Sequence, residues 1–124
     1  MTGDNYPELK FSDIEPFQDY YRDNDGYEYS VARLIDEASR LTQFDCPIAA
    51  LDLSYRIWEG QDIFGLAFHC KKVMDASLDH PIILDWRGCL ADGRHRVIKA
   101  LIEGRKTVKA VRIPWRMEPC RKHE

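Results

Sequence analysis

The chain has 124 residues, of which 44% are hydrophobic and 31% are charged, a composition typical of a soluble one-domain protein with its own core. No apolar run approaches the roughly 18 residues that a membrane-spanning helix needs, and no secretion signal is recognisable, so we expect a cytoplasmic protein. The four cysteines form no CxxC pair, which argues against a zinc site and favours reduced thiols.

The net charge of −3 conceals an uneven distribution along the chain. Residues 1–85 carry seven Lys and Arg against seventeen Asp and Glu, whereas residues 86–124 carry eleven against four. A basic C-terminal face could bind phosphate or another anion. Alternatively, the acidic part could fold over the basic part and neutralise it, and composition does not distinguish the two.

The predicted elements begin after an acidic, aromatic stretch. Residues 1–28 show no helical or strand periodicity and are interrupted by Pro7, Pro16 and Gly26. We therefore predict an extended arm with at most a helical turn near residues 16–22, followed by a single domain over residues 29–124. The arm could also occupy a basic site as a DNA mimic or an autoinhibitor. Four aromatic residues are expected to hold it on the domain: Phe11, Phe17, Tyr20 and Tyr21.

The first half of the domain is predicted to contain two helices and a strand. Ser30 can cap a helix over residues 30–42, whose apolar residues recur at helical spacing. The apolar run PIAAL, residues 47–51, predicts a buried strand. Asp62 can cap a second helix, in which Cys70 is expected to be a core residue. The apolar residues at helical spacing in that helix are Ile63, Leu66, Ala67, Cys70, Val73 and Met74.

The second half is predicted to form a hairpin, a helix and a strand. The hairpin covers residues 81–91, with Gly88 in its turn and residues 82–84 buried on both faces. A helix follows from about residue 94 to 103, and the last strand covers residues 107–113. The order α-β-α-β-β-α-β indicates an α+β domain with a small mixed sheet and packed helices.

The sequence DGRHR, which joins the hairpin to the last helix, is the best candidate for a site. A helix N-terminus exposes backbone N–H groups and a partial positive charge, and Gly93 lets a ligand approach the backbone. Arg94 and Arg96 match phosphate oxygens, and His95 can donate a hydrogen bond or carry a proton. Asp92 could cap the helix, hold an arginine, bind Mg²⁺ or a ribose hydroxyl, or act as a general base.

This pattern also has a purely structural interpretation, in which Asp-Gly caps a helix and the following side chains face solvent. However, cationic residues at a helix N-terminus oppose the helix dipole by roughly 0.3–1 kcal/mol each. A sequence selected for stability alone would carry acidic residues there. The conflict therefore favours an anion site.

The segment PIILDWRGCLADGRHRVIKALIEGRKTVKAVRI resembles the core of the ParB/sulfiredoxin-like superfamily, with its hairpin ending in (I/V)xDGxHR, its helix RxxAxxxxG and its closing strand. With the preceding PIAALDLSYRIW, the resemblance covers about residues 46–113. It implies a ParB/sulfiredoxin-like fold whose turn binds the phosphates of a nucleotide. Arg94 stands where sulfiredoxin has its nucleophilic cysteine, which speaks against sulfinic acid reduction. The GERRxRA box of partition proteins is matched only in part.

DGRHR differs at one position from the DGHHR motif of a free-serine kinase in this superfamily. That likeness implies Asp92 and His95 as catalytic residues, and it implies an upstream acid near Asp52 or Glu59. By contrast, His69 is expected to be isolated, because adjacent His and Cys side chains on a helix point about 100° apart. His80 and His123 are likewise expected to be structural or surface residues.

The leading hypothesis is a small nucleotide- or phosphate-binding protein, with phosphotransferase or nucleoside-triphosphatase activity as its catalytic form. Residues 93–96 would hold a nucleoside triphosphate or diphosphate, and Asp92 would bind Mg²⁺. The alternative is a non-enzymatic DNA-binding or regulatory module of the ParB type, and a third hypothesis is an interaction protein that acts through its acidic arm. The basic residues that could contact DNA are Arg87, Arg94, Arg96, Lys99, Arg105, Lys106, Lys109 and Arg112.

Overall fold

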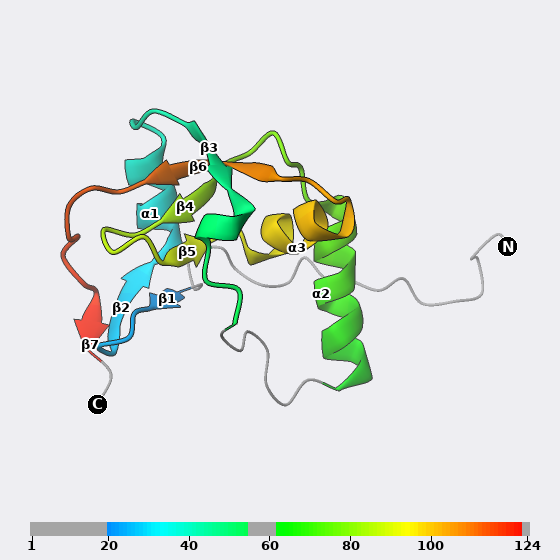
Figure 1. Cartoon of the computed structure of the whole chain (residues 1–124). Coiled ribbons are helices and arrows are strands. Elements are labelled where there is room, and N and C mark those ends of the chain that lie inside the picture. Colours follow the sequence, from blue (N-terminus) through cyan, green and yellow to red (C-terminus); the bar gives the residue numbers. More distant parts are fainter. Residues whose placement is uncertain (1–19, 55–61, 123–124) are drawn as a thin grey trace, which may run out of the picture.

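The computed structural model describes residues 20–54 and 62–122, which form an α+β structure (Figure 1). From α1 to β6 the elements follow the order that the sequence predicts, and three short strands, two before α1 and one after β6, form a second sheet. The elements are β1 (Tyr20–Arg22), β2 (Tyr27–Ser30), α1 (Val31–Ala38), β3 (Phe44–Pro47), the 3-10 turn η2 (Ile48–Ala50), α2 (Ile63–Asp75), β4 (Ile82–Leu84), β5 (Leu90–Asp92), α3 (Arg94–Ile102), β6 (Thr107–Arg112) and β7 (Arg121–Lys122).

The larger sheet has the strand order β3–β6–β4–β5 and is mixed. Strands β4 and β6 run parallel, whereas β3 pairs with β6 and β4 with β5 in the antiparallel sense. The parallel pair is possible because β5 and α3 lie between β4 and β6 in the sequence and return the chain to the same end of the sheet. The predicted small mixed sheet is therefore confirmed.

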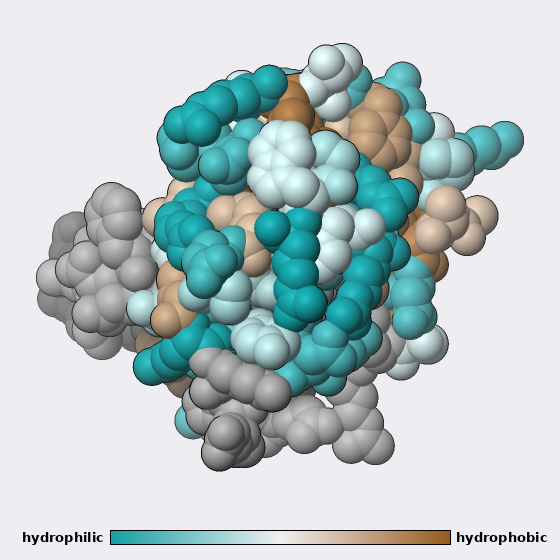
Figure 2. All heavy atoms as spheres, turned by 90° about the vertical axis from the view of Figure 1, so that its left-hand side faces the viewer, coloured by the Kyte–Doolittle hydropathy of each residue, from teal (hydrophilic) through white to brown (hydrophobic). Residues whose placement is uncertain are grey.

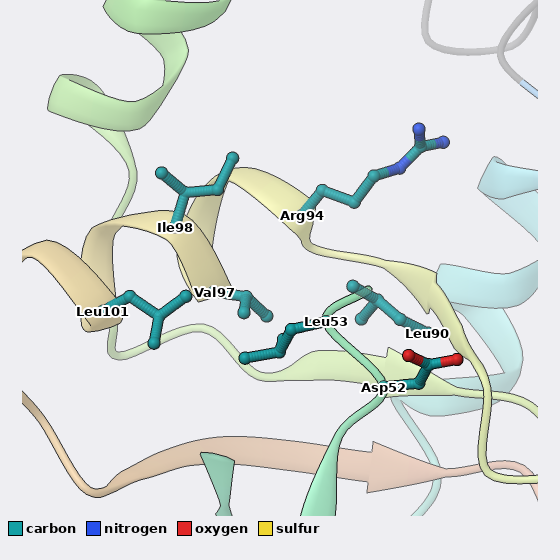
Figure 3. Close-up of a pocket in the computed structure, with 7 residues that line it drawn as sticks. All are labelled: Asp52, Leu53, Leu90, Arg94, Val97, Ile98 and Leu101. Atoms are coloured by element: carbon teal, nitrogen blue, oxygen red, sulfur yellow. The ribbon is translucent and has the colours of Figure 1, made fainter. Parts of the chain in front are cut away.

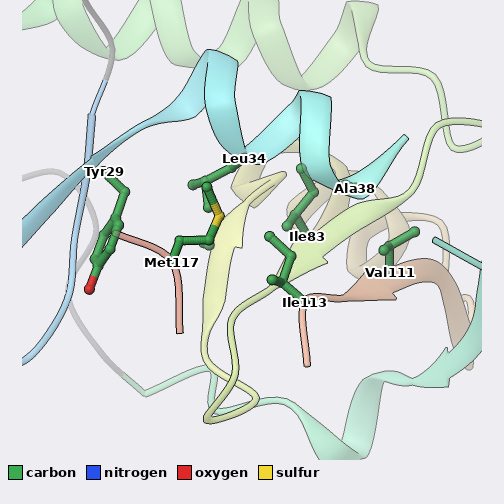
Figure 4. Close-up of a cluster of buried hydrophobic side chains, with 8 residues drawn as sticks. Tyr29, Leu34, Ala38, Ile83, Val111, Ile113 and Met117 are labelled. Carbon is green, nitrogen blue, oxygen red and sulfur yellow. The ribbon is translucent and has the colours of Figure 1, made fainter. Parts of the chain in front are cut away.

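The first hydrophobic core lies between α1 and one face of this sheet (Figure 4). Leu34 and Ala38 of α1 face Ile83 of β4, and Val111 of β6 belongs to the same cluster. Tyr29, at the end of the smaller sheet, is fully buried against it. This core consists of Tyr29, Leu34, Ala38, Ile83, Ala91, Val111, Ile113 and Met117.

The second core covers the opposite face of the sheet and includes α3. Ile82 and Leu84 of β4 point to this face, since neighbouring strand residues alternate between the two sides of a sheet. This arrangement explains why Ile82–Leu84 is an uninterrupted apolar run: the strand is buried on both faces, as predicted. The second core consists of Cys46, Ile48, Ile82, Leu84, Val97, Ala100, Val108 and Ala110.

The strand predicted over residues 47–51 is wrong. Strand β3 ends at Pro47, and residues 48–50 form a 3-10 turn in which Ile48 N–H donates to the carbonyl of Lys106 at 3.0 Å. Proline has no N–H group with which to extend the ladder, so the chain turns where the strand was expected to begin. The apolar character of this stretch reflects the burial of Ile48 in the second core.

Both helices of the first half depart from their predictions. Helix α1 ends at Ala38 rather than at residue 42, because the last backbone bonds tighten to i, i+3 spacing after it, and the Ser30 side chain makes no capping bond. Helix α2 is capped as predicted, with Asp62 Oδ1 accepting from Gly65 N–H at 2.7 Å. However, its apolar residues do not enter a core, since Ile63 is 90% and Met74 71% exposed.

Helix α2 contains no buried residue because, among the described elements, its main neighbour is α3 and not the sheet. The expectation that Cys70 is a core residue is therefore wrong, and its thiol is exposed. All four cysteines are free thiols, in agreement with the sequence. Among the described residues, no helix is long and apolar enough to span a bilayer.

The smaller sheet, of order β1–β2–β7, lies at the side of the molecule that Figure 2 presents, and that face is largely hydrophilic. The helical turn expected near residues 16–22 falls partly outside the described residues, and its described part, Tyr20–Arg22, is a strand. Glu28 of β2 is buried between Arg22 of β1 and Arg121 of β7, its ion-pair partners. The predicted boundary between residues 28 and 29 falls within β2.

Candidate functional site

The turn between β5 and α3 is built on Gly93. Its φ of 105° lies in the left-handed region, and its carbonyl accepts hydrogen bonds from Arg96 N–H at 3.0 Å and Val97 N–H at 3.1 Å. A Cβ atom at this position would lie 2.7 Å from Cγ2 of Ile82. The glycine therefore has a structural reason to be here, both for its backbone conformation and for the close approach of the turn to β4.

Arg96 is directed back toward β4. Its Nη1 donates to the carbonyl of Pro81 at 2.9 Å and lies 3.7 Å from Oδ2 of Asp92, one helical turn earlier. Both side chains are largely buried. These contacts tie the turn to the start of β4, so a ligand would compete for Arg96 and Asp92 with contacts inside the protein.

His95 pairs with His69 of α2, a contact that the sequence analysis missed. His69 Nδ1 and His95 Nε2 are 3.0 Å apart, and the rings stack with centroids 5.3 Å apart. The expectation that His69 is isolated is therefore wrong. One ring must donate and the other accept, so at least one of these two nitrogens carries a proton.

The electrostatic surroundings of the pair are positive. Burial lowers the pKa of His95 to about 4, and His69, Lys72, Arg94 and Arg96 add to this effect in that order. Burial, followed by the charge of Arg94, also lowers the pKa of His69. His95 is therefore neutral at pH 7, with cationic side chains from two helices near its ring.

This charge pattern favours an anion over a cation. The positive charges of Lys72, Arg94 and Arg96 act on His95, and the carboxylate of Asp92 lies near Arg96, so the turn would repel a free metal ion. Within residues 20–54 and 62–122, no group of three or more His, Cys, Asp or Glu side chains is arranged to hold a metal ion.

An open pocket of about 100 Å³ adjoins the turn (Figure 3). Arg94 and Asp52 are its two charged lining residues, and the others are aliphatic. Asp52, one of the two predicted upstream acids, thus lies near the turn, and its pKa is lowered by hydrogen bonds from the hydroxyl and N–H of Ser54. The other predicted acid, Glu59, lies outside the described residues.

Most of the basic residues proposed to contact DNA bind groups within the protein. Arg87 pairs with Asp25, and Arg105 pairs with Glu103 at 3.0 Å. Lys99 donates to the carbonyls of two residues at the end of α2, and Arg112 donates to the carbonyl of Trp86. Each of these side chains is thus already engaged by a group of the protein itself.

The chain was compared with known proteins by family, by sequence and by structure. No family model matches the chain, no curated protein matches it, and no solved structure matches it. The resemblance of residues 81–113 to the ParB/sulfiredoxin-like superfamily therefore stays a prediction from the sequence motif. The described chain is an α+β domain with a small mixed sheet and a positively charged turn at the N-terminus of α3.

Proposed function

We propose that this chain is a small phosphate- or nucleotide-binding protein whose site is the turn between β5 and α3. The observation that carries the proposal is the gathering of Lys72, Arg94 and Arg96 around the neutral His95 at the first turn of a helix. Arg94 and Arg96 oppose the dipole of α3, and the three cations repel one another, so a bound anion would remove both penalties. A phosphate at this place would accept hydrogen bonds from the backbone of the first turn.

Arg94 and His95 would bind such an anion in different ways. Arg94 is the cation expected to reach a ligand, because its side chain lines the pocket that adjoins the turn. His95 would donate or accept a hydrogen bond, depending on which nitrogen of the pair with His69 carries the proton. The motif DGRHR and its resemblance to nucleotide-binding turns support the same assignment.

Catalysis would add a role for Asp92. Mg²⁺ bound to a nucleotide commonly takes one or two protein carboxylates together with phosphate oxygens, and Asp92 is the carboxylate within this turn. It would bind the ion in exchange for its contact with Arg96 at 3.7 Å. A phosphotransferase or nucleoside-triphosphatase would need little more than such positioning and charge stabilisation.

Binding can be tested by calorimetry with phosphate, pyrophosphate, ADP, ATP, CTP and GTP, each with and without Mg²⁺. We expect at least one of these anions to bind, and Arg94→Gln to weaken it tenfold or more. Arg105→Gln is the matched control, because Arg105 is an exposed arginine paired with Glu103 outside the turn. An absence of heat with every anion at high micromolar protein would refute the proposal.

The catalytic form of the proposal needs a separate test. If the protein hydrolyses or transfers a phosphoryl group, Asp92→Asn should abolish turnover while nucleotide binding persists. Phosphate release measured over hours with wild-type protein, with Asp92→Asn as the comparison, checks this. Equal rates in the two proteins would remove Asp92 from the chemistry and leave a binding protein.

A further inference from the structure

The pocket beside the turn is distinctly apolar. Among the described residues, its lining combines five aliphatic side chains with Asp52 and Arg94. The aliphatic residues come from the segment before α2, from β5 and from positions 97, 98 and 101 of α3. These five residues are Leu53, Leu90, Val97, Ile98 and Leu101.

The size of the pocket limits what it can hold. Its volume of about 100 Å³ is smaller than the aliphatic cavity of about 150 Å³ that accepts one benzene molecule in another protein. A group of about four or five carbon atoms would fill it. A purine base is larger and would present ring nitrogens to a lining of leucine, isoleucine and valine side chains, which offer no hydrogen bonds.

Arg94 belongs to both the pocket and the turn. Figure 3 shows Arg94 extending from the start of α3, with its guanidinium group directed away from Leu53 and Leu101. An anion at this guanidinium would therefore stand just outside the pocket, and an aliphatic group attached to the anion could reach inside. Asp52 lies on the other side of Leu90, and its negative charge would keep the anion on the arginine side.

We infer that the ligand is a short-chain organic phosphate, with its phosphate at Arg94 and an aliphatic group of four or five carbons in this pocket. The inference rests on the proposed function, because its anion is the one assigned to the turn. It goes further in naming the substrate class: an aliphatic phosphate, or the aliphatic acceptor from which such a phosphate would be formed. The nucleobase of any nucleotide would then lie outside the pocket.

A series of alkyl phosphates from methyl to octyl tests the inference by nuclear magnetic resonance titration of backbone amides. We expect affinity to rise about fourfold for each methylene that enters the pocket, and to level off near butyl or pentyl phosphate. The amide signals of α3 should shift most. Butyl phosphate that binds no tighter than methyl phosphate would overturn the inference.

A filled pocket supplies the decisive comparison. Leu101→Trp, at a residue that is 47% exposed, should place its ring over the pocket and remove the dependence of affinity on chain length. Ile102→Trp is the matched control. Ile102 follows Leu101 on α3, is 74% exposed and does not line the pocket. Should Leu101→Trp fail to fold, Leu53→Phe fills the same space from an exposed position.

The outcomes separate the two proposals. If phosphate and methyl phosphate bind and Arg94→Gln abolishes the binding, but chain length has no effect, the pocket inference is wrong and the proposed function stands. If chain length matters equally in wild type and in Leu101→Trp, the chain lies elsewhere and the inference is again wrong. If no phosphate binds at any chain length, both proposals are wrong.

Discussion

Gly93 is the residue on which the geometry of the candidate site depends. A Cβ atom there would lie 3.1 Å from Cα of Ile82 as well as 2.7 Å from its Cγ2, and backbone of a buried strand cannot move aside cheaply. Gly104 also has a positive φ, of 72°, but nothing lies within 4 Å of its Cβ position. Any residue with a Cβ atom would therefore have a strained backbone at both positions, but it would clash with a neighbouring strand only at position 93.

We predict that Gly93→Ala lowers the free energy of unfolding by about 3 kcal/mol, through the left-handed backbone and the clash together. Gly104→Ala should lower it by about 1 kcal/mol, through the backbone alone. Urea denaturation of the two variants and the wild type measures both values. If both variants lost the same unfolding free energy, β4 would be able to move away from the added methyl group. Gly93 would then be required only for its left-handed backbone conformation.

The pair of His69 and His95 should make stability depend on pH. The pKa of His95 is about 4 in the folded chain and 6.5 in the unfolded chain, so between these values the unfolded chain binds a proton that the folded chain does not. Stability from this group is complete above pH 6.5 and is lost as the pH falls toward 4. Lys72, Arg94 and Arg96 face the ring and strengthen this effect.

We therefore predict that lowering the pH from 7 to 4.5 removes on the order of 1 kcal/mol through this pair, less than the full shift implies because the ring is partly exposed. His95→Gln should flatten the dependence over this range, whereas His80→Gln, at an exposed turn, should leave it unchanged. Thermal unfolding at a series of pH values gives the slopes. A His95 ring that titrates near 6.5 by nuclear magnetic resonance would contradict the prediction.

The candidate site could be found from sequence only where its signals are local. Cations at 94–96 conflict with a helix dipole that any predicted helix start implies, so the turn was identifiable without a structure. The contact between His69 and His95 was not, because it joins residues 26 positions apart and depends on how α2 packs against α3. Periodicity within one helix carries no information about that packing.

At the scale of elements, Lys99 joins α3 to α2. Its Nζ donates to the carbonyls of Met74 at 3.0 Å and Ala76 at 2.6 Å, at the C-terminal end of α2. Carbonyls at a helix C-terminus have no partner within the helix, and a cation there also favours the helix dipole. One side chain therefore terminates α2 and fixes it against α3, which is also the arrangement that brings His69 to His95.

We predict that Lys99→Met, which keeps the aliphatic stem, lowers the free energy of unfolding by about 1–2 kcal/mol. Amide hydrogen exchange should rise most in the last turn of α2. Lys109→Met is the control, because Lys109 is exposed on β6, away from α2. A loss of protection spread evenly over the molecule would show that Lys99 has no local role in holding α2.

An element was predicted correctly where nearby residues in the sequence mark it, and wrongly where its burial depends on distant parts of the chain. Helix α3 and strands β4 and β6 were found because an N-terminal glycine, a doubly buried run and a closing proline mark them in the sequence. The run PIAAL failed because a few apolar residues look the same in a strand and in a buried turn. The prediction that the apolar side of α2 is buried was wrong for a related reason. Helical spacing predicts a helix, but the neighbouring elements decide which of its faces is covered.

At the scale of the whole molecule, the larger sheet is the middle layer, with α1 on one face and α3 on the other. The two cores do not share a residue, but β4 and β6 contribute side chains to both of them. These two strands therefore connect the cores. The described part of the chain also leaves no buried side-chain nitrogen or oxygen without a hydrogen-bond partner. The buried carboxylate of Asp85 is the clearest example, because three donors surround it.

Asp85 links the two sheets. Its Oδ1 accepts from the backbone N–H groups of Arg87 and Cys89, at 2.9 Å each, and its Oδ2 accepts from the Tyr21 hydroxyl at 2.9 Å. The backbone bonds hold the β4–β5 turn, whereas the Tyr21 bond reaches from β1 of the smaller sheet. Burial, and then the hydrogen bond and charge of Asp85, raise the pKa of Tyr21, so the phenol keeps its proton and remains the donor.

Tyr21→Phe should therefore lower the free energy of unfolding by about 1–3 kcal/mol, since it removes one donor from a buried carboxylate. Tyr20→Phe, at the exposed neighbouring position on β1, should change it by less than about 0.5 kcal/mol. In a double-mutant cycle with Asp85→Asn, we expect a coupling of about 1 kcal/mol, because the two side chains contact each other directly. Additive losses would mean that the bond between Tyr21 and Asp85 does not unite the two sheets, and that other contacts, such as the packing of Tyr29, hold the smaller sheet in place.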